Sequence, residues 1–288
     1  MVIKSATSGP GIKGVALYDS HTDTPIRMAI VEGVTRVPVS LPYGNDLMLD
    51  IAAGRVTGTT GVNKFGSGVV AGAFDETIWD GSNMTGVTGY TYMATASTLY
   101  ISSTDAGDDQ VYEIQGLDAN WESQIVEATV SGLSFVPLSG TWLRVFRVKN
   151  LGATDNAGVI HVSDDNTDTA GGANGIPDDV TNVKAMIAIG NNQTLMAIYT
   201  IPTGCTGYMS QWVISAPKGD DVEATLWVRP NGGVFQLKDH HHIYQSKEPR
   251  EFKPYMKINE KEDIELKGHI GGGGGEVSGG FDLIVETN

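Results

Sequence analysis

Apolar and polar positions alternate with a period of two along most of this chain, which is the pattern of half-buried β-strands. The clearest segments of the first half are rich in β-branched and aromatic residues, and turn signals such as "DAGDD" separate them. They span residues 97–104, 111–118, 123–132, 142–150 and 157–164. Helical periodicity is almost absent, although "NDLMLDIAAG" at residues 45–54 fits either a strand or a brief helical turn. The pattern predicts an all-β protein.

The second half repeats this pattern with short links between the strand candidates. These cover residues 184–190, 193–202, 206–217, 222–230, 233–246, 250–258, 263–270 and 279–288. Eight strands with hairpin-length connections favour a β-sandwich or a jelly roll.

Three regions follow from these patterns. Residues 1–74 are rich in Gly, Thr, Val and Pro and contain only fragments of strands, which predicts an extended N-terminal arm or a small ancillary β region. Such a region needs another surface to pack on, for example a neighbouring subunit. Residues 75–183 form a β-sandwich region and residues 184–288 a jelly-roll-like region. Alternatively, residues 75–288 interleave into one domain.

Charge restricts the partners. The net charge is −15, and residues 75–183 carry 16 acidic side chains but only 3 basic ones. A surface this acidic repels phosphate backbones, so we expect no direct binding to nucleic acid. No apolar run approaches the length of a membrane span, and no signal peptide is recognisable, so we expect synthesis in the cytoplasm and no membrane contact. The single cysteine, Cys205, excludes an intramolecular disulfide.

Three consecutive histidines in "QLKDHHHIYQSKEP" suggest a metal site. On a strand, His240 and His242 share one face and His241 takes the other. Zinc needs a third ligand and usually a fourth. Asp239 lies on the opposite face, and His269 belongs to another strand. We therefore favour a polar strand at a sheet edge or subunit interface, and predict no metal and no cofactor.

The remaining motifs are weak. "DDNTDTAGG" begins like a calcium loop, but Thr169 and Gly175 stand where the EF-hand pattern requires Gly and Glu. A looser calcium site with Asp178 or Asp179 stays open, while a solvated acidic loop is favoured. "GGGGGEVSGG" at residues 271–280 contains no Lys and is interpreted as a flexible hairpin loop.

No nucleophile motif is present, and no carboxylate pair stands out, although acids from separate strands could still meet in space. We predict no catalytic residues and no enzymatic activity. Among the tryptophans, Trp212 and Trp227 fit core positions. Trp79 and Trp121 lie in polar segments and are better candidates for contacts with a partner.

The segment from Val62 to Gly132 resembles a family of tailed-phage virion proteins. The matching features are "KFG" at 64–66, "ETIWDG" at 76–81, Tyr90 and Tyr92, "ISS" followed by Asp108, and "IQGLDANW" at 114–121. Residues 192–212, 226–238 and the terminal "GGFDLIVETN" are also similar to that family. The resemblance covers roughly residues 60–288 and contains no active-site motif.

This resemblance implies a virion location and a non-enzymatic structural role, namely a capsid decoration (cement) protein. Its partners would be the major capsid protein or other virion proteins, and a homotrimer is favoured because local threefold axes of capsids commonly carry such proteins. The candidate contacts are Trp79, Tyr90, Trp121, Phe65, His240 and His242. Two alternatives remain: a head or tail fibre module that binds a receptor glycan, and a hydrolase on a β scaffold.

Overall fold

The computed structural model describes residues 46–70, 76–87, 89–168, 174–217, 219, 221–271 and 274–288, together with the backbone of four short strands before residue 37. The chain divides into two compact units, Met1–Arg55 and Val56–Asn288. Antiparallel sheets dominate both units, which confirms the all-β prediction.

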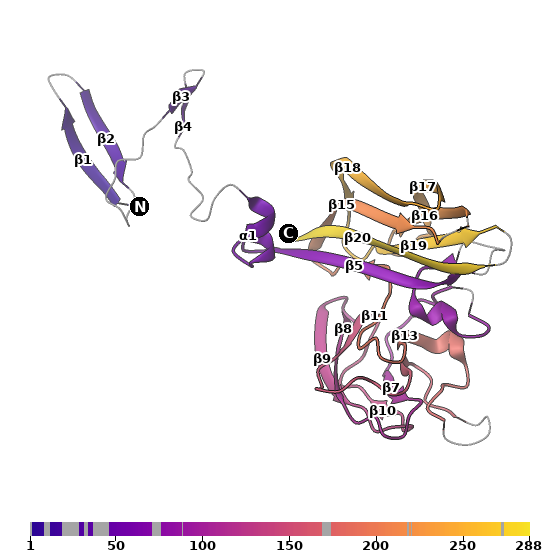
Figure 1. The fold of residues 1–288 in the computed structure, drawn as a ribbon. Helices are drawn as coiled ribbons and strands as arrows, with labels where there is room; N and C mark the ends of the chain where they lie inside the picture. The colour runs from indigo at the N-terminus through magenta and orange to yellow at the C-terminus, as the bar shows by residue number, and fades with distance from the viewer. Residues whose placement is uncertain are drawn as a thin grey trace. The chain divides into compact units, whose positions relative to one another are not determined.

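The described part of the first unit contains two hairpins and one short helix (Figure 1). Strand β1 (Val2–Ser8) pairs with β2 (Ile12–Tyr18), and β3 (Ala29–Val31) pairs with β4 (Val34–Arg36). Helix α1 (Leu47–Ala52) begins at Asp46, whose carboxylate accepts a hydrogen bond from the Leu49 amide at 3.1 Å. This N-cap decides between the two conformations that the 45–54 pattern allowed.

The second unit consists of two β-sandwiches (Figure 1). In the first sandwich, sheet I has the strand order β18–β15–β20–β5, and sheet II has the order β14–β19–β16–β17 with β6 beside β19. The strands of sheet I are β5 (Thr59–Val70), β15 (Cys205–Ser215), β18 (Lys247–Ile258) and β20 (Gly275–Thr287). Those of sheet II are β6 (Glu76–Thr77), β14 (Ile198–Thr200), β16 (Asp221–Arg229), β17 (Gln236–Tyr244) and β19 (Asp263–Ile270).

The second sandwich pairs a four-stranded and a three-stranded sheet. Sheet III has the order β10–β7–β12–β13 and sheet IV the order β11–β8–β9. The strands are β7 (Tyr100–Ser103), β8 (Val111–Leu117), β9 (Ser123–Thr129), β10 (Val136–Pro137), β11 (Arg144–Asn150), β12 (Ile160–Ser163) and β13 (Val183–Ile187). The 3₁₀ turn η1 (Asp80–Asn83) precedes this sandwich, and η2 (Val180–Asn182) lies between β12 and β13.

Each sandwich has its own apolar core. Trp212 and Phe281 of sheet I meet Leu226 and Leu266 of sheet II in the first core. The second core is built around Trp142 and residues of β8, β7, β12 and β13, including Tyr112, Ile114, Ile101, Val162 and Ala185. Alternation buries one face of strands such as β8, as the period-two pattern predicts, whereas β12, β13 and β14 are buried on both faces.

The second sandwich is an insertion in the first. Strands β5 and β6 precede it in the sequence, and β14 to β20 follow it, yet all of these belong to sheets I and II. The sandwiches do not begin and end at residues 75 and 184. Strand β5, before residue 75, pairs with the last strand of the first sandwich, and β13, which contains residue 184, belongs to sheet III.

Strand β5 also lies inside the region that the sequence assigns to the arm. It pairs with β20 over twelve residue pairs, from Thr59 opposite Glu286 to Val70 opposite Gly275. The sequence pattern hid this strand because its inward positions include Gly66 and Gly68 in place of apolar side chains. A Cβ on Gly68 would lie 2.1 Å from the carbonyl oxygen of Trp79, so only glycine fits there.

The glycine-rich run at 271–280 was interpreted as a hairpin loop, and this is wrong for its second half. Strand β20 begins at Gly275 and continues to Thr287. Gly279 and Gly280 lie in the strand, where a Cβ on Gly280 would meet the backbone of Lys64 at 2.4 Å. A Cβ on Gly279 would lie 2.8 Å from Ile214 Cδ1 of β15. Close approach of β5 at Gly280 and of β15 at Gly279, and not turn formation, accounts for these two glycines.

Candidate functional site

Two of the predicted contact residues, Trp79 and Tyr90, are core residues. Trp79 is 1% exposed and Tyr90 is 9% exposed. Their rings meet edge to face with centroids 5.2 Å apart, and the Tyr90 amide donates to Thr77 Oγ1 at 2.8 Å. Both side chains pack in the core of the second sandwich. They are therefore not placed to meet a partner at the surface.

Trp121 lies at the junction between the sandwiches. Its ring is partly buried against the first core, and the guanidinium of Arg144 lies 4.9 Å from the ring centroid. The Tyr92 ring contacts that of Tyr90, with centroids 4.8 Å apart. The guanidinium groups of Arg144 and Arg229 lie 5.1 and 4.4 Å from the Tyr92 ring centroid. Cation–π contacts of this kind favour a fixed geometry, so Trp121 supports the junction.

Asp263 is the centre of this junction. Its carboxylate accepts hydrogen bonds from Arg144 Nε at 2.8 Å, Arg229 Nη2 at 2.6 Å and Thr200 Oγ1 at 2.6 Å. One buried carboxylate thus pairs with two guanidinium groups. No pattern in the sequence pointed to this arrangement. A small cleft of about 280 Å³ opens beside it, lined by Trp121, Tyr92, both arginines and the turn at residues 230–233.

Among the aromatic contact candidates, Phe65 lies on an open face. It is 40% exposed on the outer face of sheet I, in β5 opposite Gly280. A groove of about 640 Å³ crosses this face from β5 over β20 to β15. Because Gly280 has no side chain, the groove floor at this point is backbone, beside the Phe65 ring.

Polar side chains line both sides of the groove. Asp282 on β20 accepts hydrogen bonds from the amides of Asn63 on β5 and Gln211 on β15. Ser67 donates to Glu276 at 2.8 Å. These side chains hold one another across three strands, so the face offers fixed hydrogen-bonding groups around one exposed aromatic ring.

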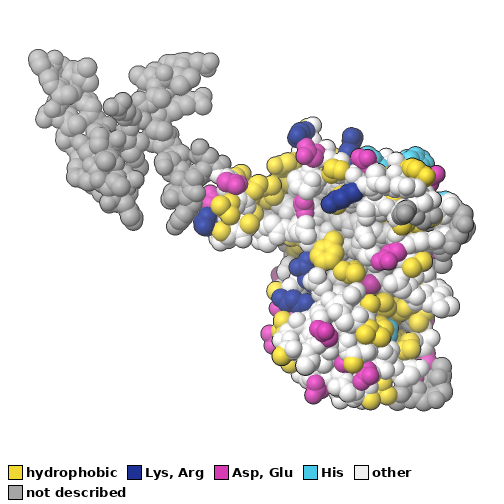
Figure 2. All heavy atoms as spheres, in the orientation of Figure 1, with side chains coloured by type: hydrophobic (Ala, Val, Ile, Leu, Met, Phe, Trp, Pro, Cys, Tyr) yellow, Lys and Arg dark blue, Asp and Glu magenta, His cyan; other side chains and the backbone are white. Residues whose placement is uncertain are grey.

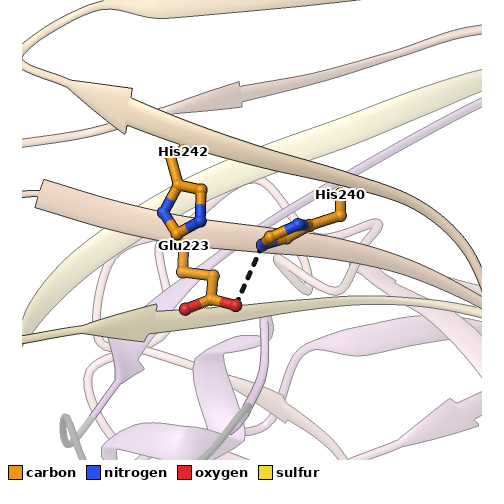
Figure 3. Close-up of side chains that lie close together, drawn as sticks. All are labelled: Glu223, His240 and His242. Atoms are coloured by element: carbon orange, nitrogen blue, oxygen red, sulfur yellow. Dashed lines mark ion pairs between the residues drawn. The ribbon is translucent and has the colours of Figure 1, made fainter.

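His240 and His242 project from the outer face of β17 at the edge of sheet II, and Glu223 of β16 joins them (Figure 3). His240 Nε2 lies 2.9 Å from Glu223 Oε1, and the two imidazole rings meet with centroids 4.6 Å apart. One potential ligand atom from each of the three residues lies within 4.8 Å of the others. The two histidines come together as the strand pattern predicts.

The register explains this grouping. Glu223 is directly opposite His242 in the β16–β17 pair, and His240 is opposite Thr225, two positions further along. His241 points to the other face, where its ring meets Trp212 at 5.2 Å. His269, considered as a further ligand, lies in β19 on the other side of Glu223. Sequence reasoning missed Glu223, because counting back from the 230–233 turn places it opposite His241. A register shift between Leu226 and Trp227 moves it opposite His242.

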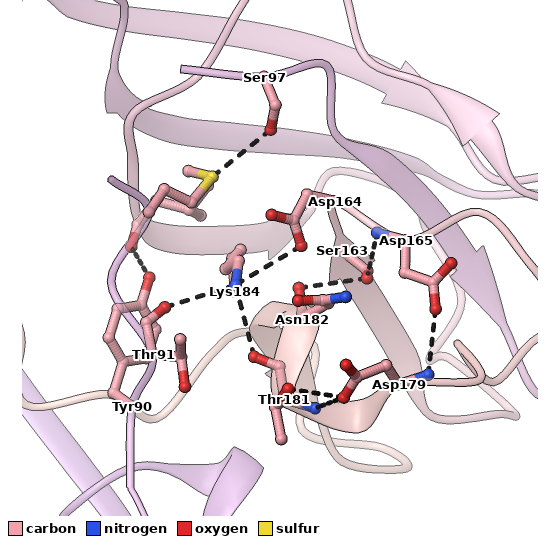
Figure 4. A network of polar contacts seen from close by, with 12 residues as sticks. Tyr90, Thr91, Ser97, Ser163, Asp164, Asp165, Asp179, Thr181, Asn182 and Lys184 are labelled. Atoms are coloured by element: carbon pink, nitrogen blue, oxygen red, sulfur yellow. Dashed lines mark hydrogen bonds and ion pairs between the residues drawn. The ribbon is translucent and has the colours of Figure 1, made fainter. Parts of the chain in front are cut away.

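The acidic segment 164–179 uses its described carboxylates for internal contacts (Figure 4). Asp164 lies 3.5 Å from the buried Lys184 Nζ, and Asp165 accepts the amide of Asp179 at 3.0 Å. Asp179 caps η2 by accepting from the Thr181 amide at 2.9 Å. Thr169 and the four residues after it lie outside the described residues, so the calcium alternative stays a prediction.

Charged side chains are scattered over the visible face of the second unit, and Lys and Arg form no continuous stripe there (Figure 2). The histidines at the surface gather near β17 in the same view. The described residues contain no helix with the length and hydropathy of a membrane span.

Comparisons with known proteins give only weak structural similarities. The sequence matches no family model and no curated protein. Among solved structures, it is weakly similar to the structure of infectious bursal disease virus, Gt strain, with 11% identity, coverage of 79% of this chain and 69% of that one, and a TM-score of 0.21. The VP2 subviral particle of infectious bursal disease virus matches with 10% identity, coverage of 80% and 72%, and a TM-score of 0.20.

Proposed function

We propose that this chain is a non-enzymatic structural protein of a tailed-phage particle, and specifically a decoration protein that binds the capsid surface and stabilises it. The sequence resemblance over residues 60–288 suggests the setting. The chain would be made in the host cytoplasm and assembled on the virion as a homotrimer.

The observation that carries the proposal is the make-up of the first unit. The described part of Met1–Arg55 contains two two-stranded hairpins and a six-residue helix. Two-stranded hairpins bury too little apolar surface to be stable alone in water, and a further packing surface is what stabilises them. In the proposed role, the major capsid protein or a neighbouring subunit supplies that surface.

The second unit fits the rest of the role. The two sandwiches have separate cores, and the buried Asp263 carboxylate of the first sandwich joins them by its ion pair with Arg144 of the second. A net charge of −15 keeps the chain soluble while it is exposed on a particle.

The test is co-sedimentation with particles of the phage whose genome encodes this chain, after the resident copy has been removed by mutation. The full chain is compared with residues 56–288, which form a compact unit of their own. We expect the full chain to sediment with the capsids and to raise the temperature at which they release DNA, while residues 56–288 stay in the supernatant. Equal failure of both chains to bind would contradict the decoration role.

A glycan-binding fibre module is the second candidate, and the groove on sheet I favours it. Phe65 offers an apolar ring beside the carboxylate of Asp282 and the amide of Gln211, which is a combination suited to a sugar ring and its hydroxyl groups. A glycan array that responds to the wild-type chain and not to Phe65→Ala would support this candidate. Trp79 and Tyr90, two other aromatic candidates for contact with a partner, are buried and do not line this groove.

A further inference from the structure

We propose that Glu223, His240 and His242 form a binding site for one divalent transition-metal ion, with zinc as the ion that fits their chemistry. The site lies on the outer face of sheet II, where β16 and β17 form a hairpin (Figure 3). It is independent of the proposed role in the virion.

The donor set matches zinc. Imidazole nitrogens and a carboxylate oxygen are standard zinc ligands, and sites with two histidines, one glutamate and an open position are well known. In a tetrahedral site with bonds of about 2.1 Å, donor atoms lie about 3.4 Å apart. His240 and Glu223 already approach to 2.9 Å, and all three donors lie within 4.8 Å of one another.

Small side-chain rotations close the remaining gap. The side chains of His240 and Glu223 are 37% and 39% exposed, so they are free to rotate toward a common ion. His242 is exposed as well. All three point to the same face because residues 240 and 242 are two apart on one strand and residue 223 pairs directly with residue 242.

The backbone beneath the site is held firmly. On the opposite face, Val222, Ala224 and Ile243 are buried in the first core. These neighbours fix the two strands and their register, so the three donors are brought together before any ion arrives. Preorganisation of this kind reduces the ordering cost of binding.

The fourth coordination position faces solvent, since the three donors come from one side and the outer face of the hairpin is exposed. Water would complete the coordination. The ion would link β17, an edge strand, to β16 through side chains in addition to the backbone ladder. Zinc should therefore raise the thermal stability of the folded chain, because it binds the folded state and the unfolded chain lacks the site.

The experiment is equilibrium dialysis of the full chain, freed of any affinity tag, against zinc, followed by metal analysis. We expect one zinc per chain for the wild type and none above background for the His240→Ala, His242→Ala double variant. Glu223→Gln keeps the shape of the side chain but loses its charge, and should weaken binding at least tenfold.

His241→Gln is the matched control, because it removes a histidine of the same strand from the opposite face. It should bind zinc like the wild type. Circular dichroism and urea unfolding of each metal-free variant show whether it is folded. Visible absorption of the cobalt(II) form then reports tetrahedral coordination in the wild type and in His241→Gln only. A wild type that binds no zinc, or a folded double variant that binds as much as the wild type, would overturn the proposal.

Discussion

Arg144 and Asp263 form a two-pronged ion pair that joins the two sandwiches, with Nε–Oδ1 and Nη2–Oδ2 distances of 2.8 and 3.1 Å. Arg144 opens strand β11 of the second sandwich, and Asp263 opens β19 of the first. Both side chains are almost fully buried. The same arginine donates to the carbonyl oxygens of Met93 and Leu143, so its hydrogen-bonding groups are well used.

We expect Arg144→Leu to lower the free energy of unfolding by about 3 kcal/mol, since loss of one partner leaves a buried carboxylate with reduced compensation. Arg229 still faces Asp263 and limits the loss. Urea unfolding followed by tryptophan fluorescence measures the change.

Arg147→Leu is the control, because Arg147 lies three positions further along the same strand and its side chain is only partly buried. Its guanidinium donates to the Asn63 carbonyl oxygen at 2.9 Å. This change should cost less than about 1 kcal/mol. Equal unfolding midpoints for the two variants would contradict a special role for the Arg144–Asp263 pair.

Gly68 tests the contact between β5 and the segment that leads into the insertion. A Cβ at this position would lie 2.1 Å from the Trp79 carbonyl oxygen and 2.2 Å from Ser82 Oγ. Because a backbone atom is in the way, Gly68→Ala should destabilise the fold by about 2–3 kcal/mol.

Thermal unfolding of Gly68→Ala is best compared with that of Gly271→Ala, where nothing lies within 4 Å of the new methyl group. The second variant should unfold near the wild-type temperature. If Gly68→Ala did the same, β5 would not pack as closely as described.

His161 makes stability depend on pH. Burial lowers its pKa to about 4, although a hydrogen bond with the backbone of Gly175 acts in the opposite direction. In the unfolded chain a histidine titrates near about 6.5, so between these values the unfolded state binds more protons. The free energy of unfolding should therefore fall as the pH drops from about 6.5 to about 4, by on the order of 3 kcal/mol from this residue.

The measurement is urea unfolding at several pH values for the wild type and His161→Gln. The glutamine variant lacks the titrating group, so the difference between the two proteins should shrink or reverse toward pH 4. Parallel pH profiles would show that His161 is protonated without cost in the folded state.

Asp108 anchors the turn after β7. Its carboxylate accepts the amides of Ala157 and Gly158, both at 2.9 Å, and the Ser103 hydroxyl. Burial alone would raise its pKa, but these hydrogen bonds outweigh it and the pKa is lowered.

Asp108→Asn should therefore cost about 2 kcal/mol at neutral pH, because the amide group cannot accept all three donors and the bonds lose their charge. The difference in unfolding free energy between the two proteins should become smaller at acidic pH, where Asp108 of the wild type is protonated. Asp109→Asn, a neighbouring acid that makes no comparable set of contacts among the described hydrogen bonds, is the control for the change in net charge.

Several features could be read from the sequence because they depend on local alternation. The all-β class, most strands after residue 97 and the shared face of His240 and His242 follow from a period of two. "ISS" followed by Asp108, noted as a mark of the resemblance, has a local cause as well, since Ser103 and Asp108 bond to each other.

Other features depend on contacts between distant segments, and no local pattern reveals them. Trp79 and Tyr90 lie in polar surroundings in the sequence, yet the insertion buries both. Strand β5 was hidden because its inward positions include Gly66 and Gly68, which lie against the carbonyl oxygens of Ile78 and Trp79. Its pairing partner β20 is more than 200 positions away. Glu223 joins the histidines only through the register of two strands.

The insertion also sets an order for folding during synthesis. Residues of the second sandwich leave the ribosome as a continuous stretch and can pair with one another at once. Strand β5 emerges before them, but its partner β20 follows more than 200 residues later and takes a central place in sheet I between β15 and β5. Such distant pairing is slow and leaves an unpaired strand edge exposed in the meantime. In the nascent chain, the second sandwich would therefore be folded before the first sandwich is complete. Strand β5 is the segment that a chaperone would have to shield in this interval.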